Sequence, residues 1–267
     1  MNKEITVKKL VLLMAFVSSH AFALSAVEVA TKNEEARQID TVEAKAKLTT
    51  GGPDKAERIK EFTWWRKLNT GKRFNTLTRF HFPPEVRGQG ILFLEGENDE
   101  SDIQMYLPSF KKVRRVESQQ QSSSFMGSEL SYTDIATPHV DDYNYKMVKD
   151  DEKCPGEPAQ KCYVIEYSPK TDKVKDRTGN SRVVSWIRKD NFMGTKGEYY
   201  DLQNQLWKVT EASETKLVDT TKNKWMSLRI RVENQKNKRF TLLEFKDVKV
   251  NKPVGDSTFT VQNLSRD

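Results

Sequence analysis

Apolar and polar residues alternate with a period of two along most of the chain. The clearest example is residues 226–232, in which Met226, Leu228, Ile230 and Val232 alternate with polar residues. In a β-strand this spacing places the apolar side chains on one face and the polar side chains on the other. Such a strand is typical of an antiparallel sheet that packs one face on a core and exposes the other to water.

Twelve further segments have the same character, because they are short, rich in β-branched and aromatic residues, and separated by turn signals. They are residues 42–48, 57–68, 73–82, 90–96, 102–107, 112–117, 143–149, 162–169, 182–189, 197–202, 206–212 and 239–250. The pattern predicts a mainly β fold of the α+β class, built on one large antiparallel sheet. No repeat or linker interrupts it, so a single domain is expected.

Two segments are predicted to be helical. Residues 28–39 precede the first strand, and Ser128 is positioned to cap a second short helix over residues 129–135, with Gly127 giving the chain freedom to enter it. Two short helices are too few to cover one face of so large a sheet. Either the sheet curls on itself, or part of its apolar face stays open.

The N-terminus has the pattern of a secretory signal peptide. Three lysines lie within residues 1–9, and the next charge after the apolar run "LVLLMAFVSSHAFAL" is Glu28. That run is shorter than the roughly 20 residues of a membrane span, so an uncleaved anchor is the weaker interpretation. Small residues at Ala21 and Ala23 predict cleavage after residue 23. We therefore expect a signal peptide at 1–23 and an exported domain at 24–267.

The charge of the chain is moderately positive. Removal of Lys3, Lys8, Lys9 and Glu4 with the signal peptide lowers the formal net charge from +7 to +5. An excess of this size favours acidic surfaces weakly and identifies no partner by itself.

Residues 106–116, "YLPSFKKVRRV", place four cations directly after an apolar turn. A nucleic-acid arm, a membrane-surface patch and a structural sheet edge are the three interpretations of this stretch, and export argues against nucleic acid. Val113 and Val116 are three apart, so they point to opposite faces of a strand. Either Arg114 or Arg115 must then approach the apolar side, where its long stem can pack and its head can reach the rim.

The chain has two cysteines, Cys154 and Cys162, which flank a turn-rich loop. In an oxidising compartment such a pair is expected to form one disulfide. The spacing does not fit a CxxC redox motif, and there are no neighbouring ligands for a metal.

Patterns typical of catalysis or of cofactors are weak. His81 and His139 lie in different segments without a metal-spaced partner, so no metal site and no cofactor are predicted. Ser124 and Ser128 lack the surroundings of a nucleophile elbow. A serine nucleophile activated by His139 stays open, because catalytic triads are made by geometry rather than by sequence order.

Six segments resemble, in order, the outer-membrane lipoprotein-sorting protein family of LolA-like fold: "FHFPPEVRGQGILFL", "QMYLPSFKKVRRV", "FMGSELSYTDI", "YVIEYSPK", "YYDLQNQLWKV" and "TLLEFKDVKVN". The resemblance covers roughly residues 42–264 and is most specific in the first three segments. One departure is Gly127-Ser128-Glu129-Leu130, where the family usually has Gly-Ser-Asp-Phe. The cysteine loop is not part of the family pattern.

The resemblance implies an incomplete antiparallel barrel wrapped around helices, with an apolar cavity that holds acyl chains. It further implies traffic of lipid or lipoprotein across the periplasm, often beside an inner-membrane exporter of the RND or MMPL type. Because no catalytic constellation emerges from the sequence, we expect a non-enzymatic carrier, and we expect it to be a monomer. Large rings and adaptable methionines suit a wall for variable acyl chains, although the same residues also build cores. The residues expected in the wall are Trp64, Phe80, Phe93, Met105, Tyr106, Phe125, Met126, Trp186, Met226 and Leu228.

A movable cover over the cavity is expected at residues 125–135, with Gly127 as its hinge. Arg114 or Arg115 would hold this cover shut through Glu129 or Asp134. Two other functions remain open at this level: an exported serine hydrolase that acts on acyl esters, and a structural adaptor of an exporter that binds no lipid.

Overall fold

The computed structural model describes residues 24–96, 101–136 and 139–266. The expected signal peptide, residues 1–23, lies outside this range. The described chain contains one sheet of thirteen strands, in the order β6-β5-β4-β3-β2-β1-β13-β12-β11-β10-β9-β8-β7. The strands are β1 (Thr41–Gly52), β2 (Lys55–Leu68), β3 (Phe74–Phe82), β4 (Gly90–Glu95), β5 (Ser101–Leu107), β6 (Lys112–Arg115), β7 (Tyr143–Cys154), β8 (Glu157–Pro169), β9 (Arg182–Arg188), β10 (Gly194–Tyr200), β11 (Leu206–Asp219), β12 (Lys224–Asn234) and β13 (Phe240–Val250).

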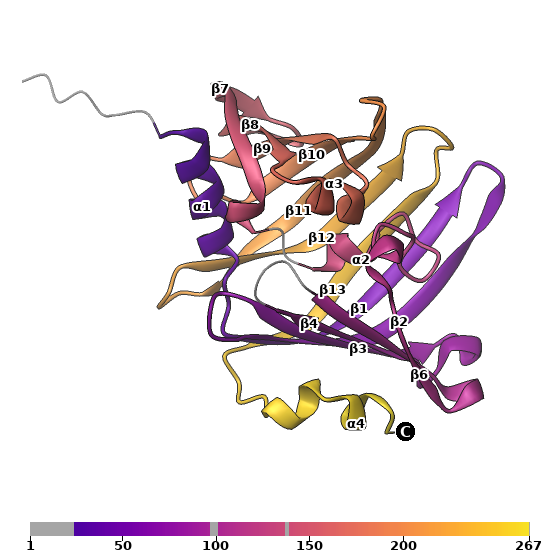
Figure 1. Ribbon diagram of the computed structural model, residues 1–267. Helices are drawn as coiled ribbons and strands as arrows, with labels where there is room; N and C mark the ends of the chain where they lie inside the picture. The colour runs from indigo at the N-terminus through magenta and orange to yellow at the C-terminus, as the bar shows by residue number, and fades with distance from the viewer. Residues whose placement is uncertain (1–23, 97–100, 137–138, 267) are drawn as a thin grey trace, which may run out of the picture.

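Every neighbouring pair in the sheet is antiparallel, and most pairs are consecutive in the sequence. The exception is β1 with β13, where Val42 lies opposite Val250 and Leu48 opposite Leu243. This pairing joins the half of the sheet that runs from β1 to β6 to the half that runs from β7 to β13. Figure 1 shows the sheet curled into an open half-barrel. The predicted large antiparallel sheet and incomplete barrel are therefore confirmed.

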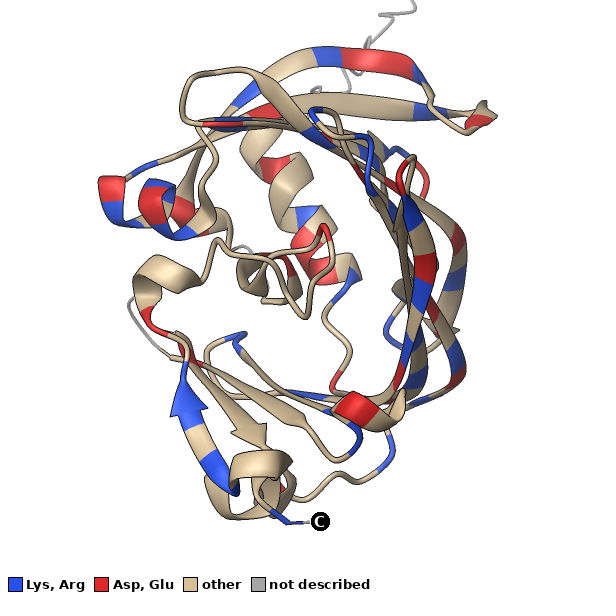
Figure 2. Cartoon of the chain, turned by 90° about the vertical axis from the view of Figure 1, so that its right-hand side faces the viewer, with Lys and Arg blue, Asp and Glu red and all other residues tan. Residues whose placement is uncertain are grey.

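Four α-helices occur in the described residues: α1 (Ala26–Ala36), α2 (Tyr132–Ile135), α3 (Asp172–Thr178) and α4 (Val261–Leu264). Five short 3₁₀ turns accompany them: η1 (Pro84–Val86), η2 (Pro108–Phe110), η3 (Ser118–Gln120), η4 (Val140–Asp142) and η5 (Asp256–Phe259). Figure 2 shows α1 on the concave side of the sheet. None of the helices in the described range combines the length and the apolar composition that a bilayer span requires.

The first helix begins at a capping box, because the Ser25 hydroxyl accepts from the backbone N–H of Glu28 and the Glu28 carboxylate accepts from the N–H of Ser25. It ends at Ala36, a few residues earlier than expected.

The prediction for the second helix was wrong at its start. Ser128 donates its hydroxyl to the Phe125 carbonyl at 2.6 Å and so closes a turn. Ser131 caps the helix instead, and α2 begins at Tyr132.

The main core lies on the concave face of β1 to β5. Phe80 and Phe125 are completely buried there, with ring centroids 6.3 Å apart. The buried members of this core are Ala46, Leu48, Phe62, Phe80, Ile91, Phe93, Ile103, Val116, Phe125, Leu130, Tyr132, Val232 and Leu243. A second core lies on the convex face, where Leu264 of α4 packs on Leu77 and Leu92.

The predicted disulfide is confirmed. Cys154 ends β7, Cys162 lies in β8, and their sulfur atoms are bonded with 5.2 Å between the Cα atoms. The bond closes the tip of the hairpin formed by these two strands.

Candidate functional site

The concave face of the sheet lines a cavity of about 400 Å³, to which α1, α2 and the chain around them contribute the other walls. Ligand pockets in proteins are commonly of this size or up to about twice as large. The inner surface of the cavity is therefore the candidate site.

One half of the cavity is apolar. Phe62 and Trp64 of β2 face Ile230 of β12 and Phe245 of β13, and the rings of Trp64 and Phe245 have centroids 5.1 Å apart. Phe125 contributes to the same wall from the chain outside the sheet. This half offers a surface on which a hydrocarbon chain can be removed from water.

The other half is lined by phenols. Tyr143 and Tyr145 of β7, Tyr167 of β8 and Tyr199 of β10 all contribute to its wall. The ring of Tyr167 lies with its centroid 5.1 Å from that of Tyr143 and 5.7 Å from that of Tyr145. Burial raises the pKa of all four hydroxyls, so they remain protonated at neutral pH.

A half-buried arginine lies where β2 meets the cavity. The guanidinium of Arg66 stacks 3.4 Å from the centroid of the Phe74 ring, and burial lowers its pKa to about 10, an effect that the nearby Glu95 carboxylate partly opposes. Arg66 nevertheless keeps its charge at neutral pH.

A second charged cluster joins α1 to the sheet. His139 lies 3.4 Å from the Glu34 carboxylate through Nδ1 and 3.5 Å from the Glu95 carboxylate through Nε2. Burial alone would lower the pKa of His139, but the two carboxylates outweigh it and raise that pKa above its usual value. The histidine thus links elements that are far apart in the sequence.

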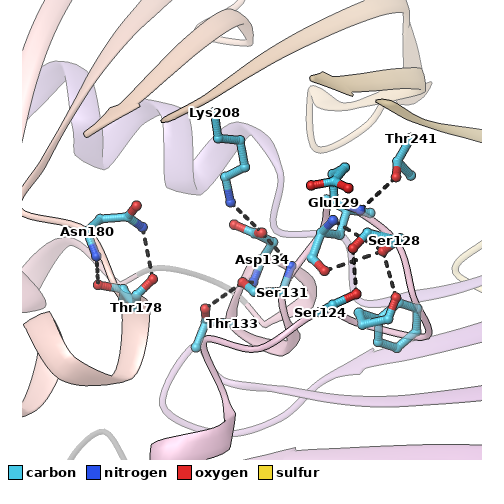
Figure 3. A network of polar contacts seen from close by, with 12 residues as sticks. Ser124, Ser128, Glu129, Ser131, Thr133, Asp134, Thr178, Asn180, Lys208 and Thr241 are labelled. Carbon is cyan, nitrogen blue, oxygen red and sulfur yellow. Dashed lines mark hydrogen bonds and ion pairs between the residues drawn. The ribbon is translucent and has the colours of Figure 1, made fainter. Parts of the chain in front are cut away.

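The segment of residues 125–135, called the cover segment below, forms part of the cavity wall through Phe125, Leu130 and Asp134. Figure 3 shows two of its polar contacts with the sheet. The Asp134 carboxylate accepts from the Lys208 ammonium at 2.6 Å, and the backbone N–H of Glu129 donates to the Thr241 hydroxyl at 2.8 Å.

The predicted gate pairs are not formed, so that prediction was wrong. The guanidinium of Arg115 lies 2.9 Å from Asp102 on the neighbouring strand β5, and Arg114 is exposed. Glu129 instead accepts from the Asn234 side chain at 2.9 Å. The reason is that β6 is the outermost strand of the sheet, where both arginines point to solvent.

Lys208 is the residue that the sequence reasoning missed. Its side chain is 1% exposed, and its ammonium lies over the rings of Tyr199 and Trp207 as well as against Asp134. In the sequence it is a lysine within a strand, and no local signal separates it from a solvated one.

The ten residues expected in the wall have different positions. Trp64, Phe125 and Met226 line the cavity. The core behind the wall contains Phe80 and Phe93, with Met105 and Met126 packed against it. Leu228 packs beside Met226 and borders a second hollow on the sheet.

Two of the ten lie away from the cavity. Tyr106 is buried beneath α4 on the convex face. Trp186 alternates with Ser185 and Ile187, which line the cavity, and its ring packs under the Lys196 ammonium. Tyr106 lies in β5 and Trp186 in β9, and apolar residues occupy both faces of each of these strands. The alternation therefore did not identify the face that points into the cavity.

The serines considered as nucleophiles are engaged with the backbone. Ser124 donates to the Ser128 carbonyl at 2.6 Å, and Ser128 donates to the Phe125 carbonyl. His139 contacts carboxylates through both ring nitrogens. In this arrangement His139 accepts no proton from Ser124 or Ser128, so neither serine is activated as a nucleophile. Within the described residues, no group of three or more metal-ligating side chains is positioned to hold a metal ion.

Comparisons with known proteins place the chain among others of this architecture. A family model described as "Uncharacterized protein" matches residues 72–266. A search of the curated proteins found no match.

Three solved structures share the fold over 90% of this chain. A domain from Vibrio parahaemolyticus, described as an outer membrane lipoprotein-sorting protein domain, matches over 98% of its own length with 23% identity and a TM-score of 0.82. A DUF1329 family protein from Desulfovibrio piger matches over 97% with 25% identity and a TM-score of 0.81. A LolA superfamily protein from Nitrosomonas europaea matches over 100% with 23% identity and a TM-score of 0.69.

Proposed function

Because the chain belongs to the family whose model matches residues 72–266 and has a LolA-like fold, we propose that it is a carrier of lipid or lipoprotein acyl chains. The observation that carries the proposal is the cavity of about 400 Å³ between the curved sheet and the helices, with one aromatic and aliphatic half. A hydrocarbon chain is the ligand that such a surface stabilises best.

The driving force is removal of methylene groups from water. Each buried methylene contributes about 0.8 kcal/mol, so ten of them contribute about 8 kcal/mol before the entropic cost of association is subtracted. Binding therefore requires neither a metal nor a covalent bond to the protein.

Transport would take place in the periplasm, between two membranes. The signal-peptide pattern of residues 1–23 and the resemblance to lipoprotein-sorting proteins support this location. An inner-membrane exporter of the RND or MMPL type is the proposed partner, with the protein acting as a monomer.

The cover segment is the proposed entrance for the ligand. Its residues contribute to the wall, and the backbone turns at Met126 and Gly127, which have φ angles of 53° and 75°. Its contact with the sheet through Asp134 and Lys208 takes the place of the arginine pairs expected from the sequence.

Native mass spectrometry of the protein purified from its own periplasm tests the carrier function. The expected result is a co-purifying lipid. Ala212→Trp should remove that lipid, because Ala212 lines the cavity and an indole would fill much of it. Ser213→Trp is the matched control, since this neighbour on β11 is exposed.

An empty protein that still binds an exporter would instead favour the structural adaptor. Release of fatty acid from an ester, abolished by Ser124→Ala or Ser128→Ala, would favour the hydrolase.

A further inference from the structure

The inner face of strands β7 to β11 differs from the rest of the cavity in its chemistry. It carries Tyr143, Tyr145, Tyr167, Ser185, Tyr199 and Thr210, so a group of hydroxyls forms one end of the cavity, away from its apolar half. A cavity for hydrocarbon alone would not require a polar end, because buried hydroxyls are unfavourable unless they are hydrogen-bonded.

Some of these hydroxyls have polar neighbours within the protein. Ser185 and Tyr199 lie close enough to Tyr167 to lower the pKa of its hydroxyl and so oppose the effect of burial, and Thr210 acts on Tyr199 in the same way. Gly197 makes this arrangement possible, because a Cβ there would lie 2.8 Å from Thr210 Oγ1 and 3.0 Å from the Tyr199 ring. The tyrosines of β8 and β10 are thus held in place by the sheet.

The tyrosines of β7 are different. Among the described residues, the hydroxyls of Tyr143 and Tyr145 have no hydrogen-bond partner, although Tyr143 is only 7% exposed. Both side chains line the cavity. A bound molecule with oxygen atoms at this end would satisfy both donors.

The charges around the tyrosines indicate what kind of oxygen is accepted. The Asp134 carboxylate, which also lines the cavity, is close enough to raise the pKa of Tyr143, Tyr167 and Tyr199. Its partner Lys208 already donates to it at 2.6 Å and is therefore engaged. Two cations act on the same tyrosines in the opposite direction: Arg177, which is paired with Asp142 at 3.1 Å, and Arg37. The charges at this end are therefore of both signs. An ester or a hydroxyl carries no charge and can accept from the two tyrosines without being repelled by either sign.

We propose that the tyrosine end of the cavity binds the uncharged, oxygen-bearing head of an amphiphile, such as the ester and hydroxyl groups of an acylglycerol, while the apolar half holds its chain. This proposal rests on the proposed carrier function and specifies the ligand class. Tyr143 and Tyr145 donate to the head group, and they distinguish such a lipid from a free fatty acid or an alkane.

Displacement of the apolar dye N-phenyl-1-naphthylamine by monolauroylglycerol, laurate and dodecane tests the proposal. The wild-type protein is expected to bind monolauroylglycerol more tightly than laurate. The double variant Tyr143→Phe/Tyr145→Phe should weaken monolauroylglycerol about tenfold, as the loss of two neutral hydrogen bonds predicts, and leave dodecane unchanged. The single variant Tyr145→Phe serves if the double variant does not fold.

Tyr106→Phe is the matched control, since this tyrosine is also buried but lies on the convex face. If the Tyr→Phe variants bind monolauroylglycerol as the wild type does, or if laurate binds best, the head-group proposal is overturned and the carrier function stands. If none of the three ligands displaces the dye from the wild-type protein, both the proposed carrier function and the head-group proposal are refuted.

Discussion

The contact between Lys208 and Asp134 gives the sharpest quantitative prediction. The two groups are 2.6 Å apart, with side chains 1% and 15% exposed. We consider Lys208→Met, which keeps the length of the stem and removes the charge. The variant leaves the Asp134 carboxylate in the cavity wall without its cation.

The magnitude follows from the distance and the burial. At an effective dielectric constant of about 20, two unit charges 2.6 Å apart attract by about 6 kcal/mol. Measured losses on removing one partner of a buried pair are about 3–5 kcal/mol, because the remaining charge is desolvated and unpaired. We therefore expect Lys208→Met to lower the free energy of unfolding by about 3–5 kcal/mol.

Replacing both partners should be milder. The double variant Lys208→Met/Asp134→Leu removes the unpaired charge, and buried pairs replaced by apolar residues are often neutral in stability. Asp134 also accepts from the backbone N–H of Ser131, and loss of this helix-capping contact costs about 1 kcal/mol. The double variant should therefore recover most of the loss.

Urea unfolding of the wild type, Lys208→Met, Asp134→Leu and the double variant gives the four free energies of a double-mutant cycle. Hydrogen exchange across residues 123–136 reports whether the cover segment opens more often. Lys216→Met, an exposed lysine of the same strand, is the control. A loss below about 1 kcal/mol for Lys208→Met, with no coupling in the double-mutant cycle, would refute the reasoning, since that is the behaviour of a solvated pair.

Three further predictions concern other parts of the fold. The pKa of His139 is raised in the folded protein, so its contribution to stability is complete below about pH 6.5, the usual pKa of histidine. This contribution is lost as the pH rises through the pKa of His139 in the folded state. Thermal melts should show the loss in the wild type and not in His139→Gln. Replacing Cys154 and Cys162 by serine should lower the free energy of unfolding by about 2–3 kcal/mol in chemical denaturation and leave lipid binding intact, because the bond closes a short loop at a hairpin tip. Arg115→Ala should change stability by less than about 1 kcal/mol, since its pair with Asp102 is largely exposed; a larger loss would mean that β6 is more deeply packed than its exposure indicates.

Strand positions could be predicted from the sequence because alternation is a local property. A strand such as residues 226–232 shows its two faces within seven residues, and the corresponding strand β12 formed as expected. The helix α3 also has local signals, namely Thr171 as N-cap and Gly179 in the left-handed conformation at its end. These signals are typical of a helix, and the prediction did not use them.

The site was less predictable because it depends on depth and on distant neighbours. Phe80 and Trp64 have the same apolar character in the sequence, yet one is in the core and the other is in the cavity wall. Similarly, the partner of Asp134 is 74 residues away on β11, and local charge patterns favoured the nearer arginines. Alternation indicates a face of a strand and contains no information on which strand lies across from it.

The open ends of the sheet have a consequence for the protein in a concentrated solution. An unpaired outer strand exposes backbone donors and acceptors to which another chain can add. Here β6 is only four residues long and carries Lys112, Arg114 and Arg115, all exposed. The other outer strand, β7, has its pairing interrupted by register shifts after Met147. Charge at one end and irregular pairing at the other oppose growth into fibres, so the half-barrel can stay open to ligands without polymerising edge to edge.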